Sequence, residues 1–560
     1  MKTPAANDEL VFLPLGGSGE IGMNLNAYGY GPPEDRKWII VDIGVTFGGA
    51  DTPGVDVILP DPTFLEERRE DILAIVLTHA HEDHIGAIGW LWPRLKAPIY
   101  ATPFTAALVR EKLRERLLLE RAPLTEIPLK GKLTIGPFEL ELITLTHSIP
   151  EPNGVAIRTP LGLIWHTGDW KIDPDPLIGE VTDVEALKRI ANEGVLAMVC
   201  DSTNVFVEGV SGSEADVRAH LTEVISQFTG RVAVTAFASN VARVESAIHA
   251  AQACGRTVCL VGRSMHKVVG AAQSVGLLKD APAFATEEEA AYLPAENVLY
   301  LCTGSQGEAR AALSRIATGQ HRNVSLRAGD AVIFSSRVIP GNEAAIFALY
   351  NALSERGVEV ITDDDENIHV SGHPCRDELT QMYQWARPKI AIPVHGERRH
   401  LVEHAKLARE LQTPQALSPR NGDLIRIAPG PAEVIDEVPA GRLYADGTTL
   451  IESDDEALRE RRRLGSEGVV SVGITVSGKK HTILSGPNVK TRGLSMLDEE
   501  EFDLALEELE ETAEAAFNRL KHGEREDDEA AEQAVARAVR KAAEKLWGKR
   551  PFVEVVLMRA

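Results

Sequence analysis

The segment 78–84 concentrates four side chains of the types that bind metal ions. They are His79, His81, Asp83 and His84. The apolar run 72–77 before the segment predicts a buried strand, and the run 85–91 after it predicts a helix. Open α/β sheets place their sites at the carboxyl ends of strands, which is where this segment falls. Neutral imidazoles and a carboxylate suit zinc or manganese. Because four ligands in one loop cannot all reach one ion, we predict two adjacent ions.

The HxHxDH pattern of this segment resembles the signature of the metallo-β-lactamase superfamily, whose other ligands follow further along the chain. Three such residues follow strand-like runs here, namely His147, Asp169 and His395. The resemblance implies that one ion is held by His79, His81 and His147. It implies that Asp83, His84 and His395 hold the other ion, and that Asp169 lies between the two.

Two residues near these motifs need separate interpretations. Asp42 closes the strand-like run 38–41 and matches the first motif of the superfamily, which implies that it orients the metal ligands without touching an ion. His166 lies at the end of the strand-like run 163–166. We interpret His166 as a strand residue beside the site and not as a ligand.

A competing motif is the glycine pattern G-x-G-x-x-G at residues 17–22, which follows the strand-like run 10–15. A dinucleotide-binding fingerprint requires a helix directly after these glycines. Asparagine, glycine and proline residues over 24–33 predict a strand and a hairpin loop instead. We therefore do not expect a dinucleotide site.

Composition limits the cellular setting. A chain of 560 residues suggests three or four domains. It contains no apolar run near the ~20 residues needed to span a membrane. Residues 1–9 carry no hydrophobic signal segment. The five cysteines form an odd set without paired spacing, which favours a reducing, cytoplasmic setting.

The net charge of −24 argues against indiscriminate nucleic-acid binding. Many of the acids lie near the C-terminus, so a locally basic groove elsewhere is compatible with the composition. Bound metal ions also add positive charge that a count of residues omits.

Three further motifs surround a long insert between Asp169 and His395. Asp201 follows the buried run 195–199, and His373 precedes His395 by about one helix. Asp201, His373 and His395 resemble the three extra motifs of the β-CASP nucleases, which act on RNA and DNA. Within that branch, the segments 369–373, 237–240 and 302–308 resemble the bacterial ribonuclease J family.

The insert alternates strand-like and helical runs, which predicts a parallel α/β domain. The predicted fold class is therefore α/β, a metallo-β-lactamase αββα sandwich with an inserted parallel α/β β-CASP domain and a small C-terminal α/β domain. The predicted domains are a metallo-β-lactamase domain in two parts (1–212 and 368–446), a β-CASP domain (213–367), a linker (447–466) and a C-terminal domain (467–560).

A phosphate pocket is predicted from small donors on glycine-permitted turns. Its residues are Ala238, Ser239, Asn240, His369, Val370, Ser371, Gly372 and His373. Ser239 and Asn240 open a helix, so an N-cap would explain them equally well chemically, although we favour a substrate contact. A structural turn explains the segment 304–307 as well as a substrate contact does.

The resemblance implies a metal-dependent exoribonuclease and endoribonuclease with two divalent metal ions per subunit, zinc and/or manganese. It would hydrolyse single-stranded RNA mainly 5′-to-3′ from 5′-monophosphorylated ends, with minor internal cleavage, in RNA decay and processing. The predicted catalytic residues are Asp201, His373, Asp83 and His84. The main alternative is a β-CASP nuclease acting on single-stranded DNA, while a scaffold protein and a small-thioester hydrolase are disfavoured. Homodimerisation through the C-terminal domain is the family-based expectation.

Overall fold

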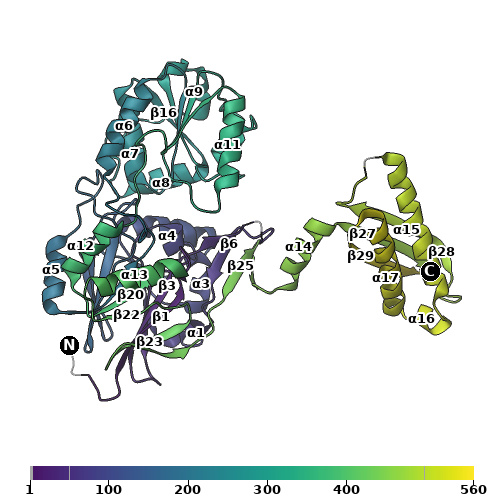
Figure 1. Ribbon diagram of the computed structural model, residues 1–560, viewed down its shortest axis with the longest axis horizontal. Helices are drawn as coiled ribbons and strands as arrows, with labels where there is room; N and C mark the ends of the chain where they lie inside the picture. Colours follow the sequence, from purple (N-terminus) through teal and green to yellow (C-terminus); the bar gives the residue numbers. More distant parts are fainter. Residues whose placement is uncertain (1–3, 50, 497) are drawn as a thin grey trace. The chain divides into compact units, whose positions relative to one another are not determined.

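The structure, a computed structural model, describes residues 4–49, 51–496 and 498–560. The chain forms two compact units, one of residues 1–46 and 59–442, the other of residues 47–58 and 443–560. Within the described residues no helix is both long enough and apolar enough to span a bilayer. Figure 1 shows the chain from its N-terminus in purple to its C-terminus in yellow.

The first unit contains an eight-stranded mixed sheet in the order β24-β23-β1-β3-β4-β7-β8-β9. Its strands are β24 (Glu433–Glu437), β23 (Asp423–Ala428), β1 (Glu9–Gly16), β3 (Leu25–Gly31), β4 (Lys37–Val41), β7 (Ile72–Val76), β8 (Ile99–Ala101) and β9 (Leu124–Glu126). Strands from β24 to β4 pair antiparallel, and those from β4 to β9 pair parallel.

A seven-stranded sheet packs against it in the order β10-β11-β12-β13-β14-β20-β22. Its strands are β10 (Lys132–Ile135), β11 (Phe138–Thr144), β12 (Asn153–Thr159), β13 (Gly162–His166), β14 (Val195–Asp201), β20 (Ile390–Val394) and β22 (Gln415–Ala416). Phe12, Val76, Leu140 and Val199 belong to one continuous apolar core between the two sheets. Burying these side chains away from water is the main force that holds the layers together.

Helices cover the outer faces of both sheets, as predicted for an αββα sandwich. The outer face of the seven-stranded sheet packs against α5, α12 and α13 through side chains such as Trp165, Leu187 and Met382. The helices are α1 (Thr63–Glu66), α2 (Glu82–Ile85), α3 (Ile88–Leu95), α4 (Pro103–Glu115), α5 (Val184–Glu193), α12 (Arg376–Ala386) and α13 (Arg398–Glu410), with a 3-10 turn at Arg69–Asp71. Two short strands, β2 (Ser18–Gly19) and β21 (Gly396–Glu397), pair parallel.

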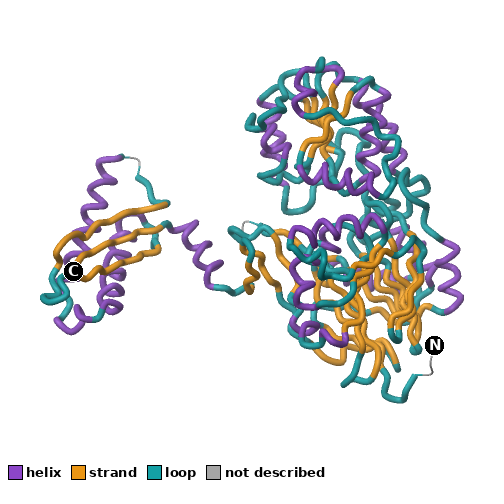
Figure 2. Tube along the Cα trace, turned by 180° about the vertical axis from the view of Figure 1, so that it is seen from behind, coloured by secondary structure: helices purple, strands orange, loops and turns teal. Residues whose placement is uncertain are grey.

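The insert forms a five-stranded parallel sheet in the order β16-β17-β15-β18-β19, as its alternating pattern predicted. Figure 2 shows these strands in orange between layers of purple helix. The strands are β16 (Thr257–Val261), β17 (Val298–Cys302), β15 (Val232–Thr235), β18 (Ala331–Phe334) and β19 (Glu359–Ile361). One face packs on α6 (Glu214–Ser226), α7 (Val241–Ala253) and α8 (Arg263–Ser274). The other packs on α9 (Glu287–Tyr292), α10 (Ala312–Ala317) and α11 (Glu343–Glu355), and a 3-10 turn lies at Ala295–Asn297.

The second unit contains a four-stranded sheet of β26 (Thr449–Glu452), β25 (Arg442–Asp446), β6 (Val57–Pro60) and β5 (Thr46–Phe47). Helix α14 (Glu456–Glu467) follows it within the segment 447–466 that the sequence suggested as a linker. A three-stranded sheet of β28 (Ile483–Arg492), β27 (Val469–Val476) and β29 (Phe552–Arg559) packs on α15 (Glu499–Arg519) and α17 (Asp528–Trp547), with α16 (His522–Glu526) between the helices. Even-numbered residues of β27 from Val470 to Val476 are buried, so this sheet has one apolar face.

Candidate functional site

The predicted ligands lie at the ends of strands from both sheets of the sandwich. His79 follows β7, and Asp42 follows β4, in the eight-stranded sheet. In the seven-stranded sheet His147 follows β11, Asp169 follows β13 and His395 follows β20. Because the two sheets are packed face to face, these strand ends bring residues from positions 42 to 395 of the chain into one place.

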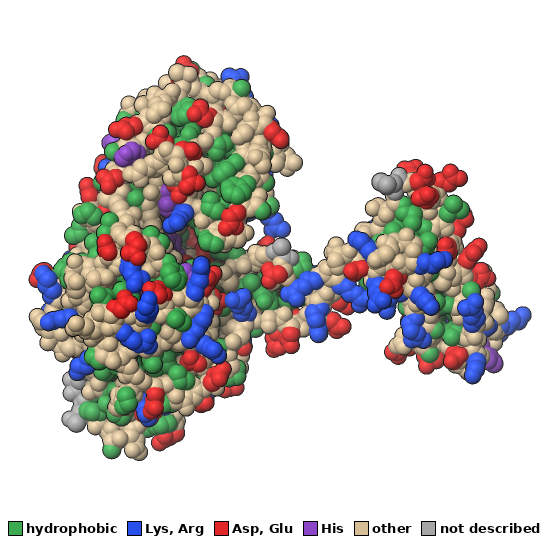
Figure 3. Space-filling view, viewed as in Figure 1, with side chains coloured by type: hydrophobic (Ala, Val, Ile, Leu, Met, Phe, Trp, Pro, Cys, Tyr) green, Lys and Arg blue, Asp and Glu red, His purple; other side chains and the backbone are tan. Residues whose placement is uncertain are grey.

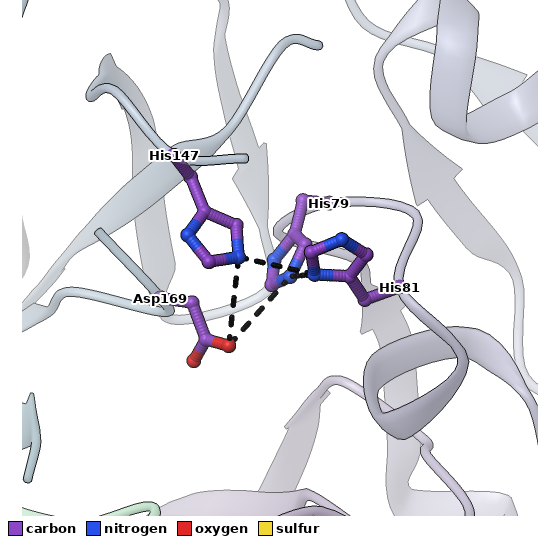
Figure 4. Close-up of side chains that lie close together, drawn as sticks. All are labelled: His79, His81, His147 and Asp169. Atoms are coloured by element: carbon purple, nitrogen blue, oxygen red, sulfur yellow. Dashed lines mark hydrogen bonds and ion pairs between the residues drawn. The ribbon is translucent and has the colours of Figure 1, made fainter. Parts of the chain in front are cut away.

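The first cluster consists of His79, His81, His147 and Asp169, whose ligand atoms all lie within 4.8 Å of one another. Figure 4 shows three imidazoles and one carboxylate directed at a common point. His81 Nδ1 lies 3.2 Å from His79 Nε2 and 3.0 Å from His147 Nε2. Three ring nitrogens this close must be explained by protons or by a cation between them.

The proton positions favour a cation. His147 Nδ1 is hydrogen-bonded to the Gly372 carbonyl, which only accepts, so the proton of a neutral His147 sits on Nδ1. Thr78 Oγ1 donates to Asp42 at 2.8 Å, so it accepts from His79 Nδ1 at 3.0 Å. The Nε2 atoms of both histidines therefore present lone pairs to His81. One proton on His81 could satisfy only one of them, whereas a divalent metal ion would satisfy all three.

The second cluster consists of Asp83, His84, Asp169 and His395. His84 Nδ1 lies 2.7 Å from Asp42 Oδ2, which leaves Nε2 of His84 facing the cluster. Thr203 Oγ1 donates to Asp201 at 2.7 Å and accepts from His395 Nδ1 at 2.8 Å. Nε2 of His395 lies 3.0 Å from Asp83 Oδ2; it donates to this carboxylate when His395 is protonated, and in the neutral ring it offers a lone pair that a bound cation would accept.

Asp169 lies between the two clusters. Its Oδ2 atom is buried and, among the described residues, has no hydrogen-bond partner. The same atom lies 3.1 Å from His84 Nε2, 3.6 Å from His395 Nε2 and 3.9 Å from His79 Nε2. A buried carboxylate oxygen without a partner costs free energy unless something charged pairs with it. The donor set and this oxygen fit divalent metal ions.

The pKa values of the first-cluster histidines and of the two carboxylates favour the protonation states that ligands need. Burial, reinforced by the neighbouring histidines, lowers the pKa of His79 and His147 well below the usual range, and burial lowers the pKa of His81 to about 4. Burial alone would raise the pKa of Asp169 and Asp83, but nearby histidines outweigh it and lower both. Neutral imidazoles and ionised carboxylates are the forms that bind metal. Burial would lower the pKa of His84 and His395 as well, but Asp169 and the other nearby carboxylates outweigh it and raise both, so a bound ion would have to displace a proton there.

Close backbone approach explains two glycines here. A Cβ atom on Gly44 would collide with the backbone of Asp83, so this glycine lets the ligand loop pack tightly. A Cβ atom on Gly372 would lie 2.7 Å from Ser148 Oγ and 2.9 Å from Cε1 of His147. The turn formed by residues 369–373, which is predicted to bind phosphate (the phosphate turn), therefore packs directly on His147, a predicted metal ligand.

Ser371 and His373 are held by residues from the end of β14. The amide of Asn204 donates to Ser371 Oγ at 2.7 Å and to the His373 carbonyl at 3.1 Å. The backbone N–H of His373 also donates to Ser371 Oγ, at 3.1 Å. Since this oxygen already accepts two hydrogen bonds, the hydroxyl hydrogen of Ser371 is available for a ligand.

Asp201 and His373 form a third group with Asp169 and His395. His373 Nδ1 lies 2.8 Å from Asp201 Oδ2, so Nδ1 carries a proton that it donates to the carboxylate. Burial would lower the pKa of His373, but Asp201 outweighs it and raises this pKa. The His373 ring packs edge-on against His147, with centroids 5.0 Å apart.

The other predicted pocket residues differ in whether their polar atoms already have hydrogen-bond partners within the protein. His369 Nδ1 is buried without a hydrogen-bond partner in the described part of the chain. Asn240 caps α7 by accepting from the Arg243 N–H at 2.9 Å, and its amide donates to Glu214 at 3.2 Å. Asn240 is therefore already fully engaged as an N-cap, whereas Ala238 and Ser239 are half-buried and Val370 is buried.

Two other patterns lie outside the clusters. His166 Nδ1 lies 2.7 Å from the hydroxyl of Tyr28, in the interior of the sandwich. The glycine-rich segment 17–22 leads into β2 and β3 and not into a helix, as a dinucleotide site would require.

Sequence reasoning overlooked three supporting residues, Thr78, Thr203 and Asn204. Each is a short polar residue next to a motif at a strand end, and each fixes a histidine or the phosphate turn by hydrogen bonds. Their position beside the motifs was the available signal. Their partners lie up to 192 residues away, so the partners themselves could not be read from the sequence.

The sandwich fold with its histidine–aspartate clusters defines a metal-dependent hydrolase of the metallo-β-lactamase superfamily. Family models agree: residues 26–180 match the metallo-β-lactamase superfamily, 229–353 the ribonuclease J β-CASP domain, 357–416 the Zn-dependent metallo-hydrolase RNA specificity domain and 456–560 the ribonuclease J C-terminal domain. The chain belongs to the ribonuclease J family of metal-dependent nucleases.

Curated relatives extend over nearly the whole chain. A ribonuclease J of Sinorhizobium meliloti is 48% identical over 99% of this chain and 98% of its own length. One of Corynebacterium glutamicum is 39% identical over 99% of this chain and 76% of its own, and one of Thermus thermophilus 39% identical over 83% and 82%. A solved protein of unknown function from Enterococcus faecalis shares the fold, with a TM-score of 0.51 at 16% identity over 75% of this chain and 100% of its own.

Proposed function

We propose that the chain degrades single-stranded RNA mainly from 5′-monophosphorylated ends in the 5′-to-3′ direction, with internal cleavage as a minor activity. One contact carries this proposal. The carbonyl of Gly372, next to Ser371, accepts a hydrogen bond from His147 of the first cluster. A phosphate held by Ser371 would therefore lie beside the metal centre, close enough for cleavage after the first nucleotide.

Two divalent ions, zinc and/or manganese, would be held by His79, His81 and His147 on one side and by Asp83, His84 and His395 on the other, with Asp169 shared. When bound, they supply charge that activates a water and stabilises the phosphate during in-line displacement. The unpartnered Oδ2 of Asp169, facing histidines of both clusters, supports this arrangement. Asp42 orients His84 directly and His79 through Thr78.

The residues of the chain then position the reaction. Asp83 and His84 shape the centre around the attacking water. Asp201 holds His373 by its Nδ1–H, so Nε2 of His373 can contact the scissile phosphate or give a proton to the leaving 3′ oxygen. Water adds to phosphorus as the bond to that oxygen breaks, and the new 5′-phosphate stays on the downstream RNA. That end can re-enter the pocket of Ser371 and His369.

The alternative substrate, the cellular location and the oligomeric state belong with this proposal. Single-stranded DNA presents the same phosphodiester, so the DNA nuclease remains the alternative until a 2′-hydroxyl preference is measured. We place the enzyme in the cytoplasm, where its five free cysteines would stay reduced. We propose a homodimer through the C-terminal domain, supported by Val556 and Met558, which are 49% and 52% exposed on the sheet face away from the helices.

The test uses RNAs that differ only in a 5′-hydroxyl, monophosphate or triphosphate, beside a DNA of the same sequence. We expect rapid mononucleotide release from the monophosphate RNA alone. Asp83→Ala with His84→Ala should abolish cleavage while the protein stays folded by circular dichroism. Equal release from all three RNAs would remove the pocket from the proposal, and full activity of the folded, metal-free double variant would remove the metal centre.

A further inference from the structure

Helix α14 in the second unit carries a concentrated basic face. Arg459, Arg462, Arg463 and Ser466 are spaced i, i+3, i+4 and i+7, which places them on one side of the helix. All four are exposed, and together with Arg550 and Glu467 they line one hollow. We call these six residues the α14 basic face. Figure 3 shows the Lys and Arg side chains gathered over α14.

The guanidinium groups of this face are largely available for a ligand. Among the described residues, the guanidinium groups of Arg459 and Arg463 make no hydrogen bond or ion pair, so no carboxylate in contact neutralises them. Arg550 Nε donates to Glu544 Oε1 at 2.7 Å. Arg462 Nε donates to the Asp51 carbonyl at 2.5 Å. The Nη atoms of Arg462 and Arg550 make no hydrogen bond to the described residues of the second unit.

Neighbouring contacts leave the face basic. Arg461, on another side of the helix, is paired with Asp446 through two bonds of 2.7 and 2.9 Å. The carboxylate of Glu467, the one acid of the lining, accepts from the backbone N–H of Arg550 at 2.8 Å. Lys549 adds a further cation by donating to the Ser466 carbonyl at 3.0 Å. Four arginines thus outnumber two carboxylates, Glu467 in the lining and Glu544 beside Arg550.

This grouping is unusual for a chain with a net charge of −24. Like charges at i and i+4, here Arg459 and Arg463, destabilise a helix on which nothing neutralises them. A basic run is often only a solvated helix face, but here a fourth arginine arrives from the far end of α17, more than eighty residues later. Convergence of separate segments on one hollow is what an anion-binding site requires.

We propose that the α14 basic face binds the phosphodiester backbone of the RNA substrate, as a contact additional to the catalytic centre. This inference rests on the proposed RNA substrate. Guanidinium groups bind phosphate oxygens through paired N–H donors. The lining contains no aromatic side chain to stack on a base, so recognition is independent of base sequence and sensitive to salt. RNAs long enough to reach both places bind more tightly than short ones.

The experiment compares two full-length triple variants. Arg459→Gln, Arg463→Gln and Arg550→Gln remove three charges from the face. Arg537→Gln, Lys541→Gln and Lys545→Gln, all exposed on α17, remove three charges elsewhere in the same unit and serve as the matched control. Binding of 5′-monophosphate RNAs of about 4 and about 30 nucleotides is measured over a salt series in a His84→Ala background, which prevents cleavage. Cleavage rates are measured with His84 intact.

We expect the face variant to raise the Kd for the long RNA about tenfold or more and to lower the slope of log K against log salt by about 2, since each contact contributes about 0.7 on single strands. Binding and cleavage of the short RNA, and all values of the control variant, should stay within about twofold. Replacing the same three arginines by lysine should retain most of the salt slope. That result would show that the loss of charge, and not a loss of folding, weakens RNA binding in the glutamine variant.

Unchanged long-RNA binding by a folded face variant would overturn the inference. Equal weakening by both triple variants would overturn it as well, because the effect would be general to the charge of the unit. Failure of the proposed function is separate: the unaltered protein would then cleave neither RNA, whatever the face variants bind.

Discussion

Arg243 and Glu214 form an ion pair at 3.1 Å that is buried between α7 and α6, with the two side chains 0% and 2% exposed. Arg243 Nη1 also donates to the carbonyls of Ser335 and Ile368, at 2.8 and 3.0 Å. Ile368 directly precedes His369. The pair therefore joins the β-CASP sheet to the start of the predicted phosphate turn, although neither charged residue belongs to that turn.

Replacing Arg243 by methionine should unfold or strongly destabilise the insert, because a buried Glu214 without its partner costs about 3–5 kcal/mol. The double change Arg243→Met with Glu214→Gln should recover folding, measured by thermal denaturation. It should still raise KM for 5′-monophosphate RNA about tenfold, since the hydrogen bond to Ile368 from a charged donor is worth about 1.5–3 kcal/mol. An unchanged KM in the folded double variant would show that the Arg243–Glu214 ion pair does not position the phosphate pocket.

The metal content of variants should show whether Asp169 is a ligand of both ions. Protein purified without chelator should carry two divalent ions per chain. His81→Ala should retain about one, because Asp83, His84 and His395 remain, whereas Asp169→Asn should weaken both. Elemental analysis after dialysis measures the content. Chelation of the unaltered protein should lower its Tm, since ligands that bind only the folded state stabilise it. Two ions in the Asp169→Asn variant would contradict a shared ligand.

A third prediction concerns acid stability. Glu141 is 4% exposed. Burial alone would raise its pKa, but hydrogen bonds from Arg189, Lys132 and Arg158 lower the pKa to about 2. A folded-state pKa below that of the unfolded chain stabilises the fold at pH above about 4.5. This contribution, up to about 3 kcal/mol, is lost as the pH falls towards 2.

Glu141→Gln should therefore lower the Tm of the protein at pH 7 and make a smaller difference near pH 3. Thermal melts of both proteins at the two pH values measure this. Glu185→Gln is the control and should show a smaller pH dependence, because this side chain is 83% exposed and its surface ion pair with Lys188 contributes little. An equal Tm difference at pH 7 and pH 3 would rule out an ionised Glu141 as the stabilising group.

Much of this fold could be predicted because its strands and helices are long, apolar and regular. The pattern of apolar residues in the insert predicts helices over 241–253 and 343–355, and α7 and α11 have these bounds. The segment 85–91 was expected as one helix, but Gly86 falls between two shorter ones, α2 and α3. The Ala87 N–H donates to the Ile43 carbonyl and the Asp83 carbonyl accepts from the Asn24 N–H, so the helical bond between Ala87 and Asp83 does not form and the helix is interrupted.

Other features depended on contacts that the sequence does not display. Residues 446–456 are polar and rich in turn-forming types, yet they contain β26, which pairs with β25. In that sheet β25 and β26 join β5 and β6, which lie almost 400 residues earlier. No local sequence pattern predicts a pairing over that distance. Histidines and carboxylates of the site were recognisable by motif, while the proton donors and acceptors that orient them, such as Thr203, depend on the folded chain.

The last prediction concerns self-association. In β29, Val553 and Val555 are buried against the helices, so Val556 and Met558 point to the opposite face of the sheet. Gly473 and Thr475 of β27 lie beside them in register and are small enough to leave this face open to a flat partner. A second copy of the same sheet would bury both side chains and remove their apolar surface from water.

Val556→Lys with Met558→Lys should convert a dimer into a monomer by placing like charges at the centre of the interface. Leu504→Lys on α15 is the control, because Leu504 is 58% exposed in the same unit but lies on a helix away from that sheet face. Light scattering coupled to gel filtration measures the mass of each full-length protein. Cleavage of short RNA should persist in all of them, since the catalytic clusters lie within the first unit. A dimer that survives the double substitution but not the Leu504 change would move the interface from the sheet to α15.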